Sequence, residues 1–382
     1  MSSQAATKPR RPKRDWVKKV MPRRPPLLLT PGPTPVPPAI LRALARPLFH
    51  HRTSRYQELF REVSQRLQRI FRTQHPVYTF TASGTGAMEA SLANFHSPGD
   101  TILVVEGGKF GERFWKIGKA YGLDTQILKI EYGETATPDQ MEAALGKNPR
   151  IKSVCIQLCE TSTGVVYDLE AIGRRLNGKN VLFIVDAISG LGADRFEMDE
   201  WGVDLTISGS QKGLMLPPGL AFLAVSSRAK ARMKEAKLPR FYFDMALYEK
   251  ALADWDTPFT PAISLVVALL ETLRAIEKEG LEKMWKRSES LARYTRNRLI
   301  EMGFELFAKR PSNGLTAFKV PAGFDGEKIL EEIREKQGIT IAGGQAEMKG
   351  KVIRIAHMGA IRKADVDRGL SALKKALKGS PR

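Results

Sequence analysis

Short apolar runs alternate with helical patterns through most of the chain, between residues 27 and 263. Runs such as "DTILVVE" (100–106) and "VLFIVDA" (181–187) predict strands that are buried on both faces. Between such runs, segments such as 55–72 place their apolar side chains on one side of a helix. Buried strands that alternate with helices are typical of a mostly parallel sheet with helices on both faces. The pattern therefore predicts an α/β fold.

Both ends of this alternating region have a different pattern. The segment "LLLTPGPTPVPP" (27–38) is rich in proline, which predicts an extended, non-helical lead-in. From residue 264, long helical stretches precede the order strand, helix, strand, strand, helix. We therefore expect the lead-in and a large domain over 27–263, and a smaller C-terminal α/β domain over 264–382.

Positive charge is concentrated at the start of the chain, which has 382 residues and a formal net charge of +20. Residues 1–26 contain nine Lys or Arg side chains and a single acid, Asp15. Because this tail is rich in proline and lacks apolar periodicity, we expect a disordered, solubilising extension. The alternative is weak contact with nucleic acid or an anionic surface. Because the solubilising interpretation is favoured, we do not expect nucleic acid as a main partner.

Composition and cysteine content are those of a folded cytoplasmic protein, with 42% apolar and 27% charged residues. No run approaches 18 apolar residues, and the start of the chain does not resemble a secretory signal, so we expect no membrane partner. The two cysteines, Cys155 and Cys159, share the run "VCIQLCE" (154–160) and would face the same side of one strand. They are too few for a disulfide framework or a zinc site, so we expect two core thiols.

Three features of the alternating region could bind a ligand. The first is "SGTGAMEA" (83–90), a turn that leads from a predicted strand into a helix, where backbone N–H groups and the helix dipole favour an anion. Gly84 and Gly86 allow an anion to approach closely. The turn matches neither a Walker loop nor the GxGxxG motif. Alone, it is interpreted equally well as a structural turn.

The other two features are a carboxylate and an amine. Asp186 ends an apolar strand, where a buried carboxylate needs a positive partner, although it could also cap a loop or pair with a local Arg. Lys212 lies in "SGSQKG" (208–213), between two apolar strands. A partly desolvated lysine has a lowered pKa and can form a Schiff base, although most single lysines are solvated. Together the three features fit pyridoxal phosphate (PLP), which has a phosphate, an aldehyde and a pyridine nitrogen.

Beyond these residues, the chain resembles the class V aminotransferases of PLP fold type I, close to the serine–pyruvate and alanine–glyoxylate aminotransferases. The resemblance extends over about residues 27–378 and implies a PLP-dependent transferase fold with a large and a small domain. The matching segments, in chain order, are "LLLTPGPTPVP", "HHRTSRYQELF", "SGTGAMEA", "ETSTGVVYDL", "VDAISGLGA", "SGSQKGLMLPPGLAF", "TPFTPAISL" and "VIRIAHMG".

For the cofactor, the resemblance implies a role for each matching residue. Lys212 would be the Schiff-base lysine and the acid/base that moves the substrate proton, and Asp186 would pair with the pyridinium. The remaining cofactor contacts would be Ser83, Gly84, Thr85 and Gln211 at the phosphate, Phe110 stacked on the ring, Thr161 near the phenolic oxygen, and Thr260 lent to the phosphate by a neighbouring subunit. Thr257 is the other choice for the last contact, and core packing is the alternative for Phe110.

For the substrate, the resemblance implies that Arg354 clamps the α-carboxylate in a two-pronged pair and that Gly32 also lines the substrate site. A surface ion pair is the alternative for Arg354. His50, His51 and His357 are interpreted as packing or structural residues, and no cluster of side chains suggests a metal.

The expected function is PLP-dependent transfer of an amino group from a small amino acid, such as alanine or serine, to a small 2-oxo acid, such as glyoxylate or pyruvate. Shared active sites imply a homodimer. The alternatives are a 2-aminoethylphosphonate or phosphoserine aminotransferase, which the positive charge would suit, another PLP lyase of this fold, and a non-catalytic nucleic-acid-binding scaffold. A cysteine desulfurase is disfavoured, because both cysteines are predicted on a buried strand.

Overall fold

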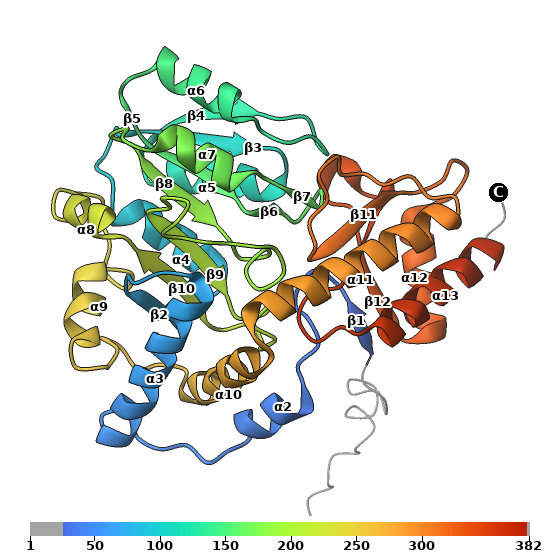
Figure 1. The fold of residues 1–382 in the computed structure, drawn as a ribbon, viewed down its shortest axis with the longest axis horizontal. Coiled ribbons are helices and arrows are strands. Elements are labelled where there is room, and N and C mark those ends of the chain that lie inside the picture. The colour runs from blue at the N-terminus through green and yellow to red at the C-terminus, as the bar shows by residue number, and fades with distance from the viewer. Residues whose placement is uncertain (1–25, 380–382) are drawn as a thin grey trace, which may run out of the picture.

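The structure is a computed structural model that describes residues 26–379, so nearly all of the basic tail predicted over 1–26 lies outside the described residues. Its largest element is a seven-stranded sheet (Figure 1). All of its strands run in one direction except β10, which is antiparallel to both of its neighbours. The predicted mostly parallel sheet is therefore confirmed. The strands, in spatial order, are β2 (Val77–Phe80), β10 (Ala221–Val225), β9 (Leu205–Gly209), β8 (Leu182–Asp186), β5 (Ile151–Gln157), β3 (Thr101–Glu106) and β4 (Asp124–Lys129).

Helices cover both faces of this sheet, and each face has its own apolar core. Successive residues of β3, Val104 and Val105, lie in different cores because strand side chains alternate between faces. One core lies against α4 (Gly84–Ala93), α5 (Lys109–Ala120), α8 (Ser227–Met233) and α9 (Met245–Leu252). The other lies against α3 (Ser54–Phe71), α6 (Pro138–Lys147), α7 (Leu169–Leu176) and α10 (Ile263–Glu279), with α2 (Pro38–Leu44) beside α10. Of these helices, α8 and α9 were not predicted.

Helix α6 begins at a residue that both caps it and is capped in return. Thr137 is the N-cap, and Pro138 occupies the first helical position, where its missing N–H leaves no donor unpaired. The Thr137 hydroxyl accepts from the Gln140 backbone N–H (3.2 Å), and the Gln140 side chain accepts from the Thr137 N–H (2.9 Å). These two reciprocal hydrogen bonds form a capping box, which fixes the start of the helix directly after Thr137.

A second, four-stranded sheet lies beside the first, in the order β1 (Leu27–Leu29), β12 (Ile339–Gly343), β13 (Val352–Ala356), β11 (Leu315–Lys319). It packs with α11 (Leu281–Glu301), α12 (Gly326–Gln337) and α13 (Lys363–Gly379), on the right in Figure 1. A short 3-10 turn, Ala346–Met348, precedes β13. The smaller α/β unit expected at the C-terminus is therefore present.

Two segments, β1 and α10, have packing partners that the predicted division at residues 263 and 264 separates from them. Strand β1 pairs with β12, because its apolar residues, among them the buried Leu29, complete the core of the small sheet. Helix α10, expected in the small domain, packs its apolar face on α2 and α3. We therefore propose that the small domain consists of residues 27–29 together with the chain from about Gly280 onward.

The two cysteines are on different strands, which corrects the prediction of one shared face. Strand β5 ends at Gln157, where the Leu158 N–H bonds the Asp186 carbonyl (2.8 Å) and the chain turns into a hairpin, β6 (Cys159–Glu160) and β7 (Val165–Val166). Cys155 and Cys159 therefore pack in different apolar clusters, and both are buried free thiols. The predicted core role of the thiols agrees with this burial.

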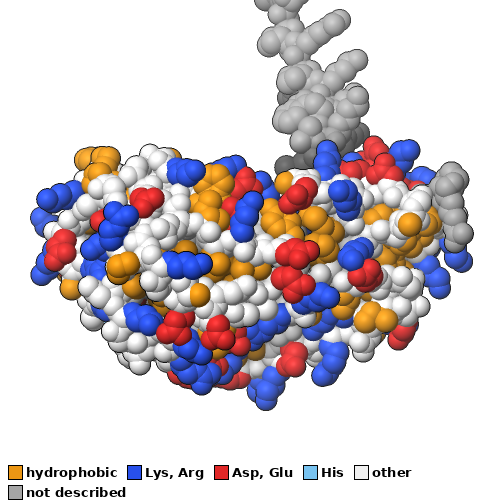
Figure 2. Space-filling model, turned by 90° about the horizontal axis from the view of Figure 1, so that it is seen from above, with side chains coloured by type: hydrophobic (Ala, Val, Ile, Leu, Met, Phe, Trp, Pro, Cys, Tyr) orange, Lys and Arg blue, Asp and Glu red, His pale blue; other side chains and the backbone are white. Residues whose placement is uncertain are grey.

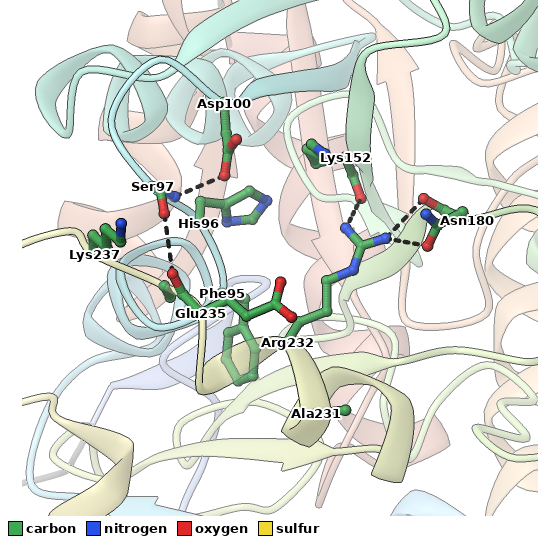
Figure 3. Close-up of a pocket in the computed structure, with 11 residues that line it drawn as sticks. Phe95, His96, Ser97, Asp100, Lys152, Asn180, Ala231, Arg232, Glu235 and Lys237 are labelled. Carbon is green, nitrogen blue, oxygen red and sulfur yellow. Dashed lines mark hydrogen bonds between the residues drawn. The ribbon is translucent and has the colours of Figure 1, made fainter.

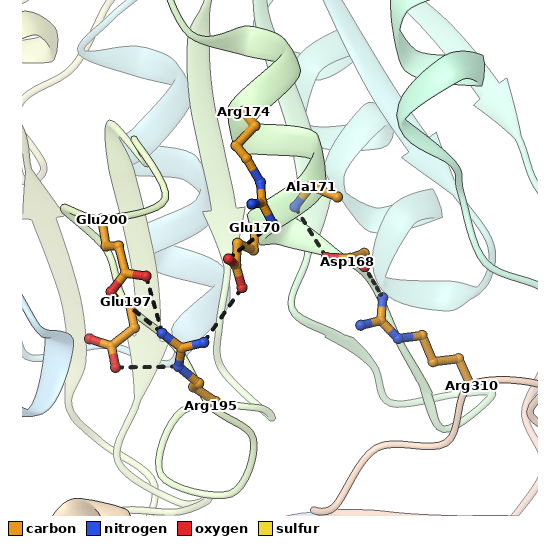
Figure 4. A network of polar contacts seen from close by, with 8 residues as sticks. All are labelled: Asp168, Glu170, Ala171, Arg174, Arg195, Glu197, Glu200 and Arg310. Carbon is orange, nitrogen blue, oxygen red and sulfur yellow. Dashed lines mark hydrogen bonds and ion pairs between the residues drawn. The ribbon is translucent and has the colours of Figure 1, made fainter.

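The small unit contacts the large one at this hairpin. The Val166 N–H bonds the Arg310 carbonyl (2.9 Å), and the Arg310 guanidinium pairs with Asp168, the N-cap of α7 (3.2 Å; Figure 4). Beside this pair, Arg195 is shared among Glu170, Glu197 and Glu200. Exposed ion pairs of this kind contribute little stability, so the backbone bond is the firmer link.

Charged side chains of both signs are mixed over the molecular surface. Figure 2 shows Lys and Arg side chains interspersed with Asp and Glu on the face in view, rather than gathered into one basic patch. Among residues 26–379, no helix is long and apolar enough to cross a membrane. Within the same residues, no group of three or more His, Cys, Asp or Glu side chains could hold a metal ion.

Candidate active site

Three of the predicted site features, Asp186, Lys212 and the Ser83 turn, lie at one edge of the large sheet. Asp186 is the last residue of β8, and Lys212 follows β9 closely. Strand β2, which leads to the Ser83 turn, runs in the same direction as β9, because each is antiparallel to β10. The carboxyl ends of β2, β8 and β9 therefore meet at the edge where open α/β sheets bind their ligands.

Lys212 is buried at this edge, with 8% of its surface exposed. Its Nζ donates to the Pro31 carbonyl, and its own carbonyl accepts from the Thr34 hydroxyl (3.0 Å). Burial lowers the pKa of Lys212 to about 8, although Cys159 and Asp186 partly oppose this shift. A substantial fraction of the amine is therefore neutral near pH 8, and a neutral amine is the nucleophilic form.

Gly32 lies directly over this lysine. A Cβ added at Gly32 would be 2.4 Å from Lys212 Cε and 2.6 Å from Lys212 Nζ, and the φ of Gly32 is +116°, a conformation that favours glycine. The lead-in that starts on the small sheet therefore passes across the amine. The structure thus places Gly32, which the resemblance implies at the substrate site, against the Lys212 amine.

Asp186 is buried with one of its two oxygens available. Its Oδ1 accepts from the Ile188 backbone N–H (2.9 Å), and within residues 26–379 the side chain has no second hydrogen-bond donor and no ion-pair partner. Burial, together with the nearby Glu160, raises the pKa of Asp186 to about 6, and the Ile188 N–H and Lys212 oppose this shift. Neither alternative for Asp186, a pair with a local Arg or a simple loop cap, accounts for the open oxygen. A cationic ring nitrogen would.

The turn at the start of α4 can receive a phosphate. Ser83 is the N-cap, but its side chain makes no capping bond, so the first backbone N–H groups are left for another acceptor. A Cβ at Gly84 would lie 2.4 Å from Ile188 Cδ1, so this position is closely packed. The Thr85 hydroxyl accepts from Arg113 Nη1 (3.2 Å).

Gln211 lies beside this turn with an unpaired amide oxygen. A Cβ built on Gly209 would be 3.2 Å from Gln211 Oε1 and 3.6 Å from the Gly84 backbone nitrogen. Gln211 Oε1 is buried without a hydrogen-bond partner among the described residues. Rotation of the amide group would place its N–H donors at the same position. The residues present therefore fit a phosphate group, and with it PLP.

Phe110 is fixed from two sides at the start of α5. Its backbone N–H donates to Glu160 Oε2 (3.0 Å), and the Arg113 guanidinium lies over its ring, 4.8 Å from the ring centre. The side chain is half-buried and belongs to none of the apolar cores of the described residues. This position favours a ring that stacks on a ligand over one that packs in the core.

Glu160 is a site residue that the sequence interpretation missed. It is fully buried, and its carboxylate accepts from the Ser162 N–H (3.1 Å), the Ser162 hydroxyl (2.5 Å), and the N–H groups of Phe110 and Gly111 (3.0 and 3.1 Å). Burial raises the pKa of Glu160, and these hydrogen bonds oppose that shift. The signal was present, since Glu160, like Asp186, is an acid at the end of an apolar run.

Arg354 reaches the site from β13 of the small sheet. It is 5% exposed, and its guanidinium donates to the Gly343 carbonyl (2.6 and 3.0 Å) and to the Thr161 carbonyl (2.8 Å). Burial lowers the pKa of Arg354 to about 10. No carboxylate of residues 26–379 forms an ion pair with it, so the alternative of a surface ion pair is wrong. A buried guanidinium whose only partners are carbonyls can donate its N–H groups to the carboxylate of a ligand.

Thr161, which the resemblance implies near the phenolic oxygen, lies beside this arginine. Its carbonyl accepts from Arg354, and its hydroxyl shares a short hydrogen bond with the Ser189 hydroxyl. The Thr161 hydroxyl already has a partner, so it would have to exchange or share this bond in order to contact a phenolic oxygen.

The two threonines of "TPFTP" are not equivalent. Thr257 is buried, and its hydroxyl donates to the Phe259 carbonyl (2.8 Å), within its own turn. Thr260 is exposed, and no hydrogen bond among the described residues joins it to Lys212 or to the Ser83 turn. The structure of one chain therefore leaves Thr260 as the hydroxyl that is free to contact another molecule.

The contacts of His357 agree with the structural role predicted for it. His357 is buried between the Thr316 hydroxyl (2.8 Å) and the Asn313 carbonyl (2.7 Å), and burial lowers its pKa to about 3, as expected for a structural residue. His50 and His51 stack on each other with ring centres 4.9 Å apart.

The molecule also has a cavity of about 640 Å³ at the opposite, amino end of the strands (Figure 3). There the Arg232 guanidinium donates to the carbonyls of Lys152 (3.3 Å) and Asn180 (2.8 Å). Every predicted site residue lies elsewhere, so this cavity is separate from the Lys212 edge.

Comparison with known sequences agrees with this geometry. The profile of the family described as "Aminotransferase class-V" matches residues 28–368. The chain is 42% identical to a "Soluble hydrogenase 42 kDa subunit" of Anabaena cylindrica, over 92% of this chain and 93% of that protein. It is 34% identical to an "L-aspartate–glyoxylate aminotransferase" of Paracoccus denitrificans, over 87% and 86% of the two chains.

The fold is also similar to the solved structures of aminotransferases. An aspartate aminotransferase of subgroup IV from Thermus thermophilus superposes with a TM-score of 0.85 at 36% identity, covering 92% of this chain and 99% of that chain. An alanine–glyoxylate aminotransferase from Nostoc sp. superposes with a TM-score of 0.90 at 32% identity, covering 94% and 96%.

Proposed function

The chain belongs to the class V aminotransferase family and is a PLP-dependent aminotransferase, and we propose that Lys212 holds the cofactor and that the substrates are small amino acids and 2-oxo acids. The observation that carries this proposal is the buried Lys212 amine, with its lowered pKa, at the same sheet edge as the open Asp186 oxygen. Two of the relatives are named for small substrates, one as an L-aspartate–glyoxylate and one as an alanine–glyoxylate aminotransferase, which supports small substrates here.

Each residue of the edge has a role in this proposal. When bound, PLP supplies an aldehyde that condenses with amines and a ring that withdraws electrons. Lys212 would hold the cofactor and carry the proton that leaves and returns at the substrate Cα. Asp186 would pair with the ring nitrogen and keep it protonated. Phe110 would stack on the ring, and Gln211 with the N–H groups of the Ser83 turn would bind the phosphate.

A panel of amino donors and acceptors tests the substrate class. Alanine, serine and aspartate would each be paired with glyoxylate, pyruvate and 2-oxoglutarate, with absorption followed at about 410–430 nm, where the lysine-bound cofactor absorbs. We expect the highest kcat/KM with a small donor and with glyoxylate or pyruvate. Preference for O-phosphoserine or 2-aminoethylphosphonate would instead favour a phosphorylated or phosphonate substrate. No transfer with any pair would contradict the proposal.

Arg354 would bind the substrate α-carboxylate, because it is buried without an acidic partner in the described chain. Arg354→Lys keeps a positive charge but loses the two-pronged geometry. We expect KM for the amino donor to rise by about 10²-fold, since breaking a buried charge pair is costly, while cofactor affinity stays within twofold. The matched control is Arg228→Lys, which alters an ion pair with Asp204 at the other end of the sheet. An unchanged KM in Arg354→Lys would remove this residue from the substrate site.

We further propose a homodimer in which Thr260 reaches the partner's cofactor. An exposed aromatic cluster lies beside Thr260: Phe241 is 76% exposed, and the rings of Phe241 and Tyr242 lie 5.8 and 5.0 Å from that of Phe259. Exposed apolar clusters mark interaction surfaces. A second copy of the chain would bury these rings and bring Thr260 to the other site.

Phe241→Lys tests this dimer. We expect wild-type protein to sediment at twice the chain mass at micromolar concentration, and Phe241→Lys to sediment mainly as a monomer with cofactor affinity reduced by at least about tenfold, because a buried lysine without a partner is costly. Thr260→Ala should weaken cofactor binding while the dimer persists. A wild-type monomer with full cofactor affinity would contradict the shared site.

We also propose a cytoplasmic location. Cys155 and Cys159 are buried free thiols, as is common in reducing compartments. Fractionation of cells that express the tagged full chain would test this, with the protein expected in the cytosolic fraction and recovery from another compartment counting against it.

A further inference from the structure

The side-chain amide of Gln157 is fully buried, and neither its nitrogen nor its oxygen has a hydrogen-bond partner among residues 26–379. Buried polar groups are almost always paired, because a donor or acceptor that is removed from water without a partner costs free energy. An amide with both ends unpaired is therefore unusual, and it calls for a partner that the chain alone does not provide.

Gln157 is the direct neighbour of Asp186. It is the last residue of β5, and its Cα pairs in register with that of Asp186, the last residue of β8. The preceding pair, Ile156 and Val185, faces the core against α3 and α7. Because strand side chains alternate, Gln157 and Asp186 both face the other side, toward α4 and α5, on strands about 4.8 Å apart.

Of the three charged side chains considered as partners for the Gln157 amide, only Asp186 has a free acceptor oxygen. Each Glu160 oxygen already accepts two hydrogen bonds, from Ser162 and from the N–H groups of Phe110 and Gly111. Lys212 can only donate when it is charged, and its Nζ is bonded to Pro31. Asp186 has one bonded oxygen and one open oxygen.

We propose that Gln157 is a positioning residue of the cofactor site, whose amide N–H donates to the Asp186 carboxylate and holds it before the ring nitrogen. This inference rests on the proposed cofactor role of Asp186. The in-register strand pair sets the two side chains next to each other on one face of the sheet. Cofactor binding would stabilise the bond, because the carboxylate then faces a cation. Gln157 does not itself touch the reacting atoms.

Gln157→Leu removes the amide at nearly constant volume. In the cofactor-free protein we expect the melting temperature to stay the same or rise, because a buried group without partners is lost. In PLP titrations of the same protein, followed by absorption, we expect affinity to fall by about tenfold. If Gln157→Leu fails to fold, Gln157→Met, which fills the same space with an unbranched chain, replaces it.

Two comparisons separate positioning from a general structural effect. Thr206→Val is the matched control, because Thr206 is also fully buried with an unpaired hydroxyl but pairs in register with Val185 and so faces the opposite core. Its cofactor affinity should stay within twofold of wild type. In an Asp186→Asn background, replacement of Gln157 should have at most a twofold effect, since the two residues act as one unit.

The inference is overturned if Gln157→Leu binds PLP as tightly as wild type, or if its loss of affinity is equally large in the Asp186→Asn background. If wild-type protein takes up no PLP at all, the proposed function fails, which is a different result from normal uptake that is insensitive to Gln157.

Discussion

Lys212→Ala should lower the rate of amino transfer by at least about 10⁴-fold, because it removes both the covalent attachment of the cofactor and the base that moves the Cα proton. The Lys212 amine is buried beneath Gly32, since a Cβ added at Gly32 would lie 2.6 Å from Lys212 Nζ. Lys212→Arg should lose as much activity, since a guanidinium stays protonated and cannot condense with an aldehyde.

Steady-state rates with the preferred donor and acceptor measure this effect, and Lys116→Ala, an exposed lysine paired with Glu112, is the control. The wild-type amine should also capture the aldehyde faster as pH rises from 6 to 8 and level off above about 8, since its lowered pKa makes it neutral there. More than 1% residual turnover in Lys212→Ala would mean that another group performs the chemistry.

Asp186→Asn has the second largest expected effect, a decrease of about 10²- to 10⁴-fold in the rate of Cα proton removal. The neutral amide keeps the shape of the carboxylate but cannot hold a proton on the ring nitrogen, so the ring withdraws electrons less strongly. The cofactor should still bind, because the phosphate turn and Lys212 are unchanged.

Stopped-flow absorption with an amino donor isolates this step, and Asp199→Asn, which changes a carboxylate bonded to Thr73 far from the edge, is the control. Cofactor affinity should also depend on pH through the protonation of Asp186. The pKa of Asp186 is raised to about 6 in the cofactor-free protein, so below that pH the carboxylate is neutral and cofactor affinity should fall. Near-normal proton removal in Asp186→Asn would exclude the pairing with the ring nitrogen.

Local patterns predicted the sheet and the meeting of Asp186 with Lys212. Uninterrupted apolar runs identify strands buried on both faces, and parallel strands end at one edge, so residues that follow β8 and β9 were expected at the same edge. The structure adds that β8 and β9 are neighbours, which brings Asp186 and Lys212 close together.

Long-range pairings were beyond the reach of the sequence. Leu27–Leu29 pairs with residues more than 300 positions away, and nothing in the three leucines distinguishes the small sheet from the large one. The packing of helix α10 was hard to predict for the same reason, since its apolar face does not specify whether it packs on α3 or on the second sheet. Both cases concern packing partners, not the elements themselves.

Glu160 and Gln157 were missed because their significance depends on neighbours from other segments. Glu160 is explained by the N–H groups of Phe110 and Gly111, some 50 residues earlier in the chain. Gln157 stands out only when the pairing of β5 with β8 sets it beside Asp186 and its amide proves unpaired. In the sequence, each is one polar residue near the end of an apolar run.

Addition of PLP to the full chain, followed by borohydride reduction and peptide mapping of the pyridoxyl label, identifies the lysine that holds the cofactor. We expect one label per chain, on Lys212, and none in Lys212→Ala. A label on any other lysine, or no label on the wild-type protein, would rule out Lys212 as the cofactor lysine.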